Sequence, residues 1–221
     1  MNLRHGVNRC AAITGMVVAA AVLTTPQVMA AGDPMNAEPA SRTAGTAGTT
    51  ESLGRLGPLT DLVIERIRVS DDVAASKYGT DSPIEDPKRE AQVLEQVRQQ
   101  ADRAGVDPDA AAVFFRDQIT ASKLVQKGLF ARWTAHPEEA PTTRPDLDRI
   151  RERLDQLTTA LLQELKDTEH LRGEPVACTV QLVWAGATGA ARERLDRLHR
   201  QALDTATESV CRSGEPTAQH V

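Results

Sequence analysis

Apolar residues recur at helical spacing through the central part of this 221-residue chain. Leu59, Leu62, Val63 and Ile67 show the pattern, because residues three and four positions apart share one face of an α-helix. No run of four or more alternating apolar and polar residues is bounded by turn residues, so strands are not expected. The pattern predicts an all-α fold, a single-domain helical bundle.

Two Asp-Pro pairs mark the beginnings of internal helices. In Asp86-Pro87 and in Asp107-Pro108 the aspartate suits the N-cap position and the proline suits the first helical position. Gly105 ends the first of these helices near residue 104, and the second is predicted to reach about Trp133.

Further helices are predicted on both sides of this pair. One precedes it, from about residue 59 towards 78. After a proline-rich connector, Asp146 opens a helix with a leucine stripe that includes Leu154, Leu157 and Leu161. A single final helix is predicted from about residue 190 to 212.

The N-terminus has the pattern of a secretory signal peptide over residues 1–30. Arg4, His5 and Arg9 precede an uncharged apolar run at residues 11–23, and Val28-Met29-Ala30 forms a small-residue cleavage site. The run is shorter than the roughly 20 residues that span a bilayer. We therefore expect a secreted or periplasmic protein with no membrane association after cleavage.

Composition separates the domain from its flanks. Residues 31–52 are mainly Ala, Gly, Thr, Ser and Pro, which predicts a disordered linker. Residues 213–221 have the same character and predict a flexible tail. Residues 53–212 lie between them and suffice for one domain with its own core.

The cysteines favour one disulfide. Cys10 lies in the leader and leaves with it, so an exported chain keeps Cys178 and Cys211, and the oxidising compartment favours their pairing. Two unpaired buried thiols are the alternative. No metal site is expected, because four histidines show no ligand-like spacing to each other or to the cysteines: His136, His170, His199 and His220.

The charge balance argues against a nucleic-acid partner. Cleavage removes Arg4 and Arg9 but no acidic residue, which leaves 24 basic against 31 acidic side chains. Such a chain lacks the basic surface that binds phosphate backbones. Aromatic residues are also too few to form a stacking platform for single strands.

Six polar residues occupy helical spacings where a plain core helix would not need them. Arg66 and Lys77 are 11 residues apart, about three turns, so both cations project from nearly the same helix face. Ser122 and Gln126 form an i, i+4 pair and also share a face. With Arg89 and Glu90, they predict a pocket for a small dianion.

Four short runs containing these residues resemble the all-helical chorismate mutases. They are Glu65-Arg66-Ile67, Asp72-Val73-Ala74-Ala75-Ser76-Lys77, Pro83-Ile84-Glu85-Asp86-Pro87-Lys88-Arg89-Glu90, and Phe114-Phe115-Arg116-Asp117-Gln118-Ile119 followed by Ala121-Ser122-x3-Gln126. The export signal, the cysteine pair and the added C-terminal helices resemble the secreted, gamma-type subclass. The resemblance covers residues 56–212.

The resemblance implies a chemistry without cofactor or metal. Chorismate mutases convert chorismate to prephenate by a unimolecular Claisen rearrangement, so the enzyme must fold a dicarboxylate into its reactive shape. Negative charge grows on the ether oxygen as its C–O bond breaks, and donors placed there favour the transition state.

Residue roles follow from the resemblance. Lys77 and Gln126 match the two donors to the ether oxygen, and Arg66 matches an arginine that clamps a carboxylate. Ser122 matches a hydroxyl that helps to bind the ring carboxylate, and Glu90 matches the acceptor for the ring hydroxyl.

The remaining positions form the periphery of the implied site. The backbone near Asp86 assists Glu90, and Arg89 belongs to the same wall. Arg151 matches an arginine that secreted members supply from their own C-terminal half. A monomer is therefore competent in principle, although the resemblance makes a homodimer plausible.

Two positions depart from the secreted pattern. Val93 stands where some secreted members carry glutamine, and Gln126 stands where some carry glutamate. A glutamate would have to be protonated to donate, whereas an amide donates without titrating. The sequence therefore predicts a rate that is nearly flat between about pH 5 and 8, given a reference carboxylate pKa near 4.3.

Two other functions are compatible with the same fold. One is a non-catalytic secreted interaction module, and the other is a lyase that eliminates pyruvate from isochorismate by a similar pericyclic path. Fold alone does not separate them, because function resides in the site.

Overall fold

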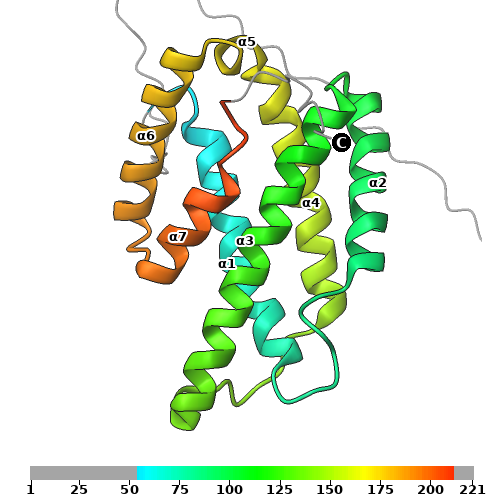
Figure 1. Cartoon of the computed structure of the whole chain (residues 1–221), viewed down its shortest axis with the longest axis vertical. Coiled ribbons are helices and arrows are strands. Elements are labelled where there is room, and N and C mark those ends of the chain that lie inside the picture. Colours follow the sequence, from blue (N-terminus) through cyan, green and yellow to red (C-terminus); the bar gives the residue numbers. More distant parts are fainter. Residues whose placement is uncertain (1–53, 212–221) are drawn as a thin grey trace, which may run out of the picture. The chain divides into compact units, whose positions relative to one another are not determined.

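The computed structural model describes residues 54–211, which consist of helices and connecting segments without a strand (Figure 1). The predicted signal peptide, linker and tail, residues 1–30, 31–52 and 213–221, lie outside the described residues. The all-α prediction is confirmed for the described part of the chain. Within it, no helix is long and apolar enough to cross a membrane.

The helices follow one another with short connections. Their bounds are α1 Gly57–Lys77, α2 Pro87–Ala104, α3 Pro108–Ala135, a short 3-10 helix η1 Pro137–Glu139, α4 Leu147–Asp167, α5 Glu169–Arg172, α6 Pro175–Arg192 and α7 Arg197–Ala206. The first four α-helices agree with the bounds that the sequence predicted.

Local chemistry explains where α2 and α3 begin and where α2 ends. The Asp86 carboxylate accepts a hydrogen bond from the backbone N–H of Arg89 at 2.9 Å, as an N-cap does. Asp107 accepts in the same way from Ala110 at 2.6 Å. Gly105 ends α2 at φ +70°, a left-handed conformation that favours glycine. All three predicted boundary signals are confirmed.

The core lies around α1 and α3. α1 packs against α3, α4, α6 and α7, while α3 lies between α2 and α7 (Figure 1). Leu59, Val63 and Ile67 from α1 meet Phe115 from α3 in one buried cluster. Burying each such side chain contributes about 1.5–3 kcal/mol. The same cluster includes Val97 from α2 and Leu161 from α4, so it holds the four helices α1 to α4 together.

The prediction of one final helix over residues 190–212 is wrong. Residues 190–192 are the end of α6, a turn follows in which Arg194 adopts φ +49°, and α7 begins at Arg197 and ends at Ala206. Asp196 caps α7 by accepting from the backbone N–H of His199 at 2.9 Å. α6 buries mostly small residues such as Ala185 and Gly189, so the sequence has no leucine stripe that would have predicted this helix.

The predicted disulfide between Cys178 and Cys211 is present, with a Cα–Cα distance of 5.5 Å. Cys178 lies in the first turn of α6, and Cys211 lies after the end of α7. The bond therefore ties these two helices into an antiparallel hairpin.

Candidate active site

A cavity of about 190 Å³ lies among α1, α2, α3 and α4. Seven residues singled out in the sequence line it: Arg66, Lys77, Asp86, Arg89, Glu90, Ser122 and Gln126. Its apolar walls come from Val73, Ile84, Val93, Ile119 and Leu154. Residues more than 50 positions apart in the chain thus meet around one cavity.

Arg66 is held at the base of the cavity by the core. Its guanidinium lies 5.5 Å from the centroid of the Phe115 ring. It donates to the Leu154 carbonyl and to the Thr158 hydroxyl, each at 3.4 Å. Burial lowers the pKa of Arg66 to about 10, an effect that the nearby Asp155 charge opposes. The group is therefore a charged, poorly hydrated cation at neutral pH.

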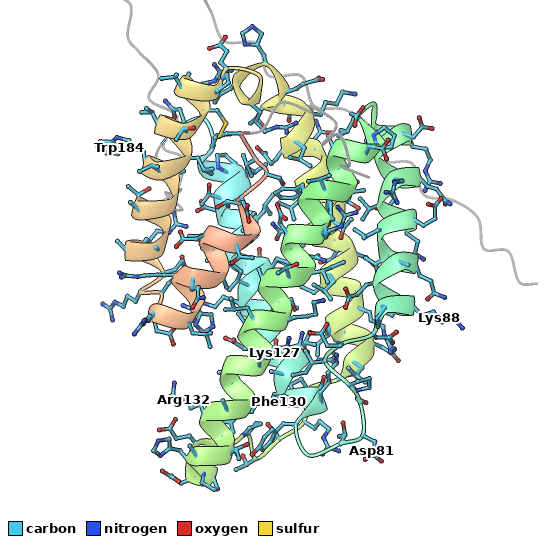
Figure 2. All side chains as sticks on the ribbon, viewed as in Figure 1. Asp81, Lys88, Lys127, Phe130, Arg132 and Trp184 are labelled. Carbon is cyan, nitrogen blue, oxygen red and sulfur yellow. A yellow bond between two sulfur atoms is a disulfide. The ribbon has the colours of Figure 1, made fainter. Side chains whose placement is uncertain are left out.

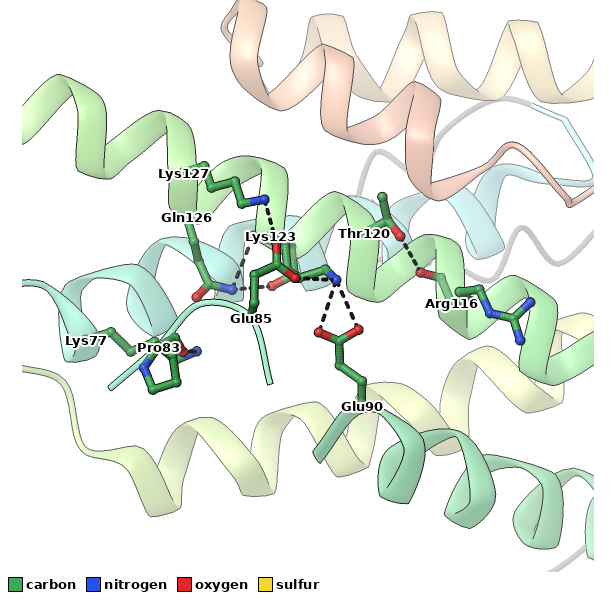
Figure 3. A network of polar contacts seen from close by, with 10 residues as sticks. Lys77, Pro83, Glu85, Glu90, Arg116, Thr120, Lys123, Gln126 and Lys127 are labelled. Carbon is green, nitrogen blue, oxygen red and sulfur yellow. Dashed lines mark hydrogen bonds and ion pairs between the residues drawn. The ribbon is translucent and has the colours of Figure 1, made fainter. Parts of the chain in front are cut away.

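Lys77 lies at the last turn of α1, three turns after Arg66. Its ammonium donates to the Pro83 carbonyl at 2.9 Å, which joins the helix end to the loop before α2 (Figure 3). Burial lowers the pKa of Lys77, while the charges of Asp86 and Glu90 raise it and offset part of the effect. Lys77 is thus a second, partly desolvated cation in the cavity.

Gln126 is buried on α3 and is only partly satisfied. Its Nε2 donates to the Ser122 hydroxyl at 3.1 Å and to the Ser122 carbonyl at 3.3 Å. Ser70, which the sequence analysis did not single out, donates to the same hydroxyl at 2.9 Å. The Gln126 Oε1 atom has no hydrogen-bond partner among the described residues. Such orphan atoms are rare in interiors, so this amide keeps an unused hydrogen-bond acceptor beside the cavity.

Lys123 is a cavity residue that the sequence analysis missed. Its ammonium lies 3.0 Å from both carboxylate oxygens of Glu90 and 2.9 Å from Glu85 (Figure 3). Burial lowers the pKa of Lys123, but the bonds to Glu85 and Glu90 outweigh it and raise the pKa. Its position between Ser122 and Gln126 was the available signal, but only contact with α2 reveals its partners.

Glu85 lies outside the cavity lining and is held by two lysines. Lys127 contacts one of its carboxylate oxygens at 2.5 Å, and Lys123 contacts the other at 2.9 Å. The hydrogen bonds from Lys127 and Lys123 lower the pKa of Glu85 to about 2. The loop before α2 is thereby fastened to α3.

The cavity lining has an excess of positive charge. Four cations, Arg66, Lys77, Arg89 and Lys123, face two carboxylates, Asp86 and Glu90. The formal charge of these six side chains is +2, which is opposite in sign and equal in size to the charge of a dianion. A titratable nucleophile such as Cys, and any His, are absent from this lining. The arrangement can therefore bind, orient and polarise a small dicarboxylate.

Arg151 is not brought into the cavity. Its guanidinium donates to Asp148 at 2.8 Å, and its side chain is 60% exposed. It lies one helical turn before Leu154, which does line the cavity, on the same side of α4. Its predicted contact with a substrate stays a prediction.

The fold and site define an all-helical protein with a cavity lined by four cations, and the comparisons identify its family. The family model described as chorismate mutase type II matches residues 58–127, which span α1, α2 and most of α3. The chain belongs to this chorismate mutase family.

Among members of the family, the chain is similar to secreted chorismate mutases. The chain is 35% identical over 164 residues to the secreted chorismate mutase of Mycolicibacterium smegmatis, covering 74% of this chain and 90% of that protein. It is 34% identical over 166 residues to the Mycobacterium tuberculosis secreted chorismate mutase, covering 75% and 83%. The crystal structure of a chorismate mutase from Burkholderia phymatum superposes with a TM-score of 0.68, at 34% identity, and covers 72% of this chain and 97% of that one.

Proposed function

We propose that this protein catalyses the rearrangement of chorismate to prephenate outside the cytoplasm. The observation that carries the proposal is the cavity lining, in which a formal charge of +2 surrounds an unsatisfied amide on α3. Membership of the chorismate mutase family supports the same activity. Export is supported by the predicted signal peptide and by the secreted relatives.

Binding selects the reactive shape of the substrate. In this proposal Arg66 clamps one carboxylate through its planar guanidinium, and Ser122 and Arg89 contribute to holding the other. The apolar walls limit the volume in which the side chain of chorismate moves. Fixing both carboxylates removes the freedom that otherwise opposes a folded, near-attack geometry.

Lys77 and Gln126 act on the ether oxygen. Its negative charge increases as the C–O bond breaks, so donors that are already oriented stabilise the transition state more than the ground state. For Gln126 to donate there, its side-chain amide must flip, so that Oε1 and Nε2 exchange positions. Oε1 then accepts from the Ser122 hydroxyl, and Nε2, which Ser122 now engages, is released towards the substrate.

Glu90 accepts the ring hydroxyl in this proposal, and Lys123 makes that possible. A free carboxylate in the cavity would repel a dicarboxylate, but Lys123 contacts both oxygens of Glu90 at 3.0 Å. The pair presents an acceptor without an unbalanced charge. Asp86 contributes through its cap at the start of α2, and Arg151 closes the site from α4 on rotation away from Asp148.

The test is a chorismate assay on the mature chain, residues 31–221, in which prephenate and pyruvate are measured separately. We expect prephenate without pyruvate, and a loss of about 10²–10³ in kcat for Lys77→Ala, the cost of removing one such donor. Lys88→Ala, at an exposed lysine beside the site, is the matched control. Pyruvate as the main product would support the lyase, and a folded but inert wild type would support a non-catalytic module.

A further inference from the structure

Ser70 is a buried serine of α1 whose hydroxyl reaches a second helix. α1 buries three side-chain hydroxyls, Thr60, Ser70 and Ser76, each no more than 5% exposed. Those of Thr60 and Ser76 bond, in the described part of the chain, to carbonyls of α1 itself at 2.8 Å, the usual way in which a helix satisfies a buried hydroxyl. Ser70 lies 3.2 Å from its own such carbonyl, on Arg66, but 2.9 Å from the Ser122 hydroxyl on α3. Its closer partner therefore lies on the neighbouring helix, against which α1 packs (Figure 2).

The Ser70 hydroxyl has one hydrogen, so it donates to one of these two oxygens at a time. When Ser70 donates to the Arg66 carbonyl, its oxygen accepts the Ser122 hydrogen, and Ser122 has none left for Gln126. When Ser70 donates to Ser122, the Ser122 hydrogen is available to the Oε1 atom of Gln126. The direction of the Ser70 hydroxyl thus decides whether Ser122 is a donor or only an acceptor towards this amide.

The ether oxygen of the substrate needs the second arrangement. It offers lone pairs and no hydrogen, so it is attracted by Nε2 of Gln126 and repelled by Oε1. Nε2 donates to Ser122 at 3.1 Å in this structure, and it is released only if Oε1 takes its place beside Ser122. Ser70 and Gln126 are 3% and 4% exposed, so water has little access to replace a hydrogen bond between these side chains.

We propose that Ser70 is a positioning residue for the rearrangement, an inference that rests on the proposed function. Ser70 donates to Ser122, Ser122 donates to Gln126 Oε1, and Gln126 Nε2 thereby faces the ether oxygen. The relay connects α1 to α3 and then to the reacting atom, and none of its members changes its charge. Because Ser70 orients a donor that acts in the transition state, its loss affects kcat more than KM.

A double-mutant cycle with Ser122 tests the relay. In the mature chain, residues 31–221, Ser70→Ala should lower kcat for prephenate formation about 3- to 10-fold, the contribution of one hydrogen bond of this kind, and change KM less. In the Ser122→Ala background the same substitution should have no further effect on kcat, because Ser70 then has no partner on α3. A loss of equal size in both backgrounds would assign Ser70 a role within α1 alone and overturn the proposal.

Ser76→Ala is the matched control. It removes an equally buried hydroxyl from the same helix, but one that bonds to a carbonyl of α1. Its kcat should equal that of the wild type, and the circular dichroism spectrum verifies that each variant is folded. A loss in Ser76→Ala as large as that in Ser70→Ala would attribute both effects to the stability of α1 and would also overturn the relay.

The side-chain amide of Gln126 gives a readout that does not depend on activity. Its two Nε2 hydrogen signals in a nitrogen–hydrogen correlation spectrum, identified by their loss in Gln126→Glu, should move in Ser70→Ala and stay in place in Ser76→Ala. Signals that stay in place in Ser70→Ala would overturn the relay even if chorismate is converted. An inert wild type whose Gln126 signals do respond to Ser70→Ala would overturn the proposed activity and support the relay.

Discussion

Replacing Lys123 by methionine tests the charge balance of the cavity directly. Lys123 and Glu90 are 20% and 27% exposed, and the ammonium lies 3.0 Å from the carboxylate. The substitution keeps most of the side-chain length but leaves the Glu90 charge facing the substrate. At about 6 Å, with an effective dielectric constant of about 20–60, one such repulsion costs about 1–3 kcal/mol. The KM for chorismate should therefore rise by roughly 5- to 150-fold.

The assay is steady-state prephenate formation at several salt concentrations. We expect Lys123→Met to raise KM more than it lowers kcat, and added salt to reduce the difference from wild type, because screening weakens the repulsion. Lys123→Arg keeps the positive charge, so its KM should be close to that of the wild type. Lys127→Met is the matched control, since Lys127 contacts Glu85 but has no ion pair with Glu90.

A second substitution, at Glu90, separates the effect of charge from any structural effect of Lys123→Met. Glu90→Gln removes the repulsion, so in the Lys123→Met background it should return KM towards that of Glu90→Gln alone. A double variant with additive losses would refute the charge-balance explanation, since additive losses indicate independent roles. An unchanged KM in folded Lys123→Met would refute it as well.

Three further predictions concern pH and stability. The wild-type kcat should be nearly flat between about pH 5 and 8. In the Gln126→Glu variant kcat should rise on acidification, because a carboxyl group donates only when it is protonated. A pH–rate profile of both proteins tests this. Changing Cys178 and Cys211 to serine should lower the free energy of unfolding in urea by about 3–4 kcal/mol while activity at 25 °C persists. Hydrogen bonds to Asp71, and then Asp196, raise the pKa of His199 above 6.5, so its contribution to stability is complete below pH 6.5 and is lost as pH rises through the raised pKa. His199→Gln should flatten the fall in unfolding free energy above pH 6.5, measured by urea unfolding at a series of pH values.

Local signals in the sequence were sufficient for the first four helices. The side chains of Asp86 and Asp107 bond the backbone three residues ahead, and Gly105 adopts its left-handed turn from its own conformational freedom. Such interactions lie within one turn of chain, so the residue order alone predicts them. α6 was not predicted, because the residues that it buries are mostly small, and the predicted final helix began too early, because the stop before α7 depends on Arg194 at positive φ, an unusual residue for that conformation.

The sequence by itself determined the helical class, the disulfide pair and most of the polar residues of the cavity, because periodicity and motif spacing are properties of residue order. Only the tertiary structure decided which partners these residues contact and how far they are removed from water. Packing of α3 against α2 pairs Lys123 with Glu90, and packing of α1 against α3 and α4 desolvates Arg66. These outcomes depend on distances between residues far apart in the chain, which spacing along one helix does not contain.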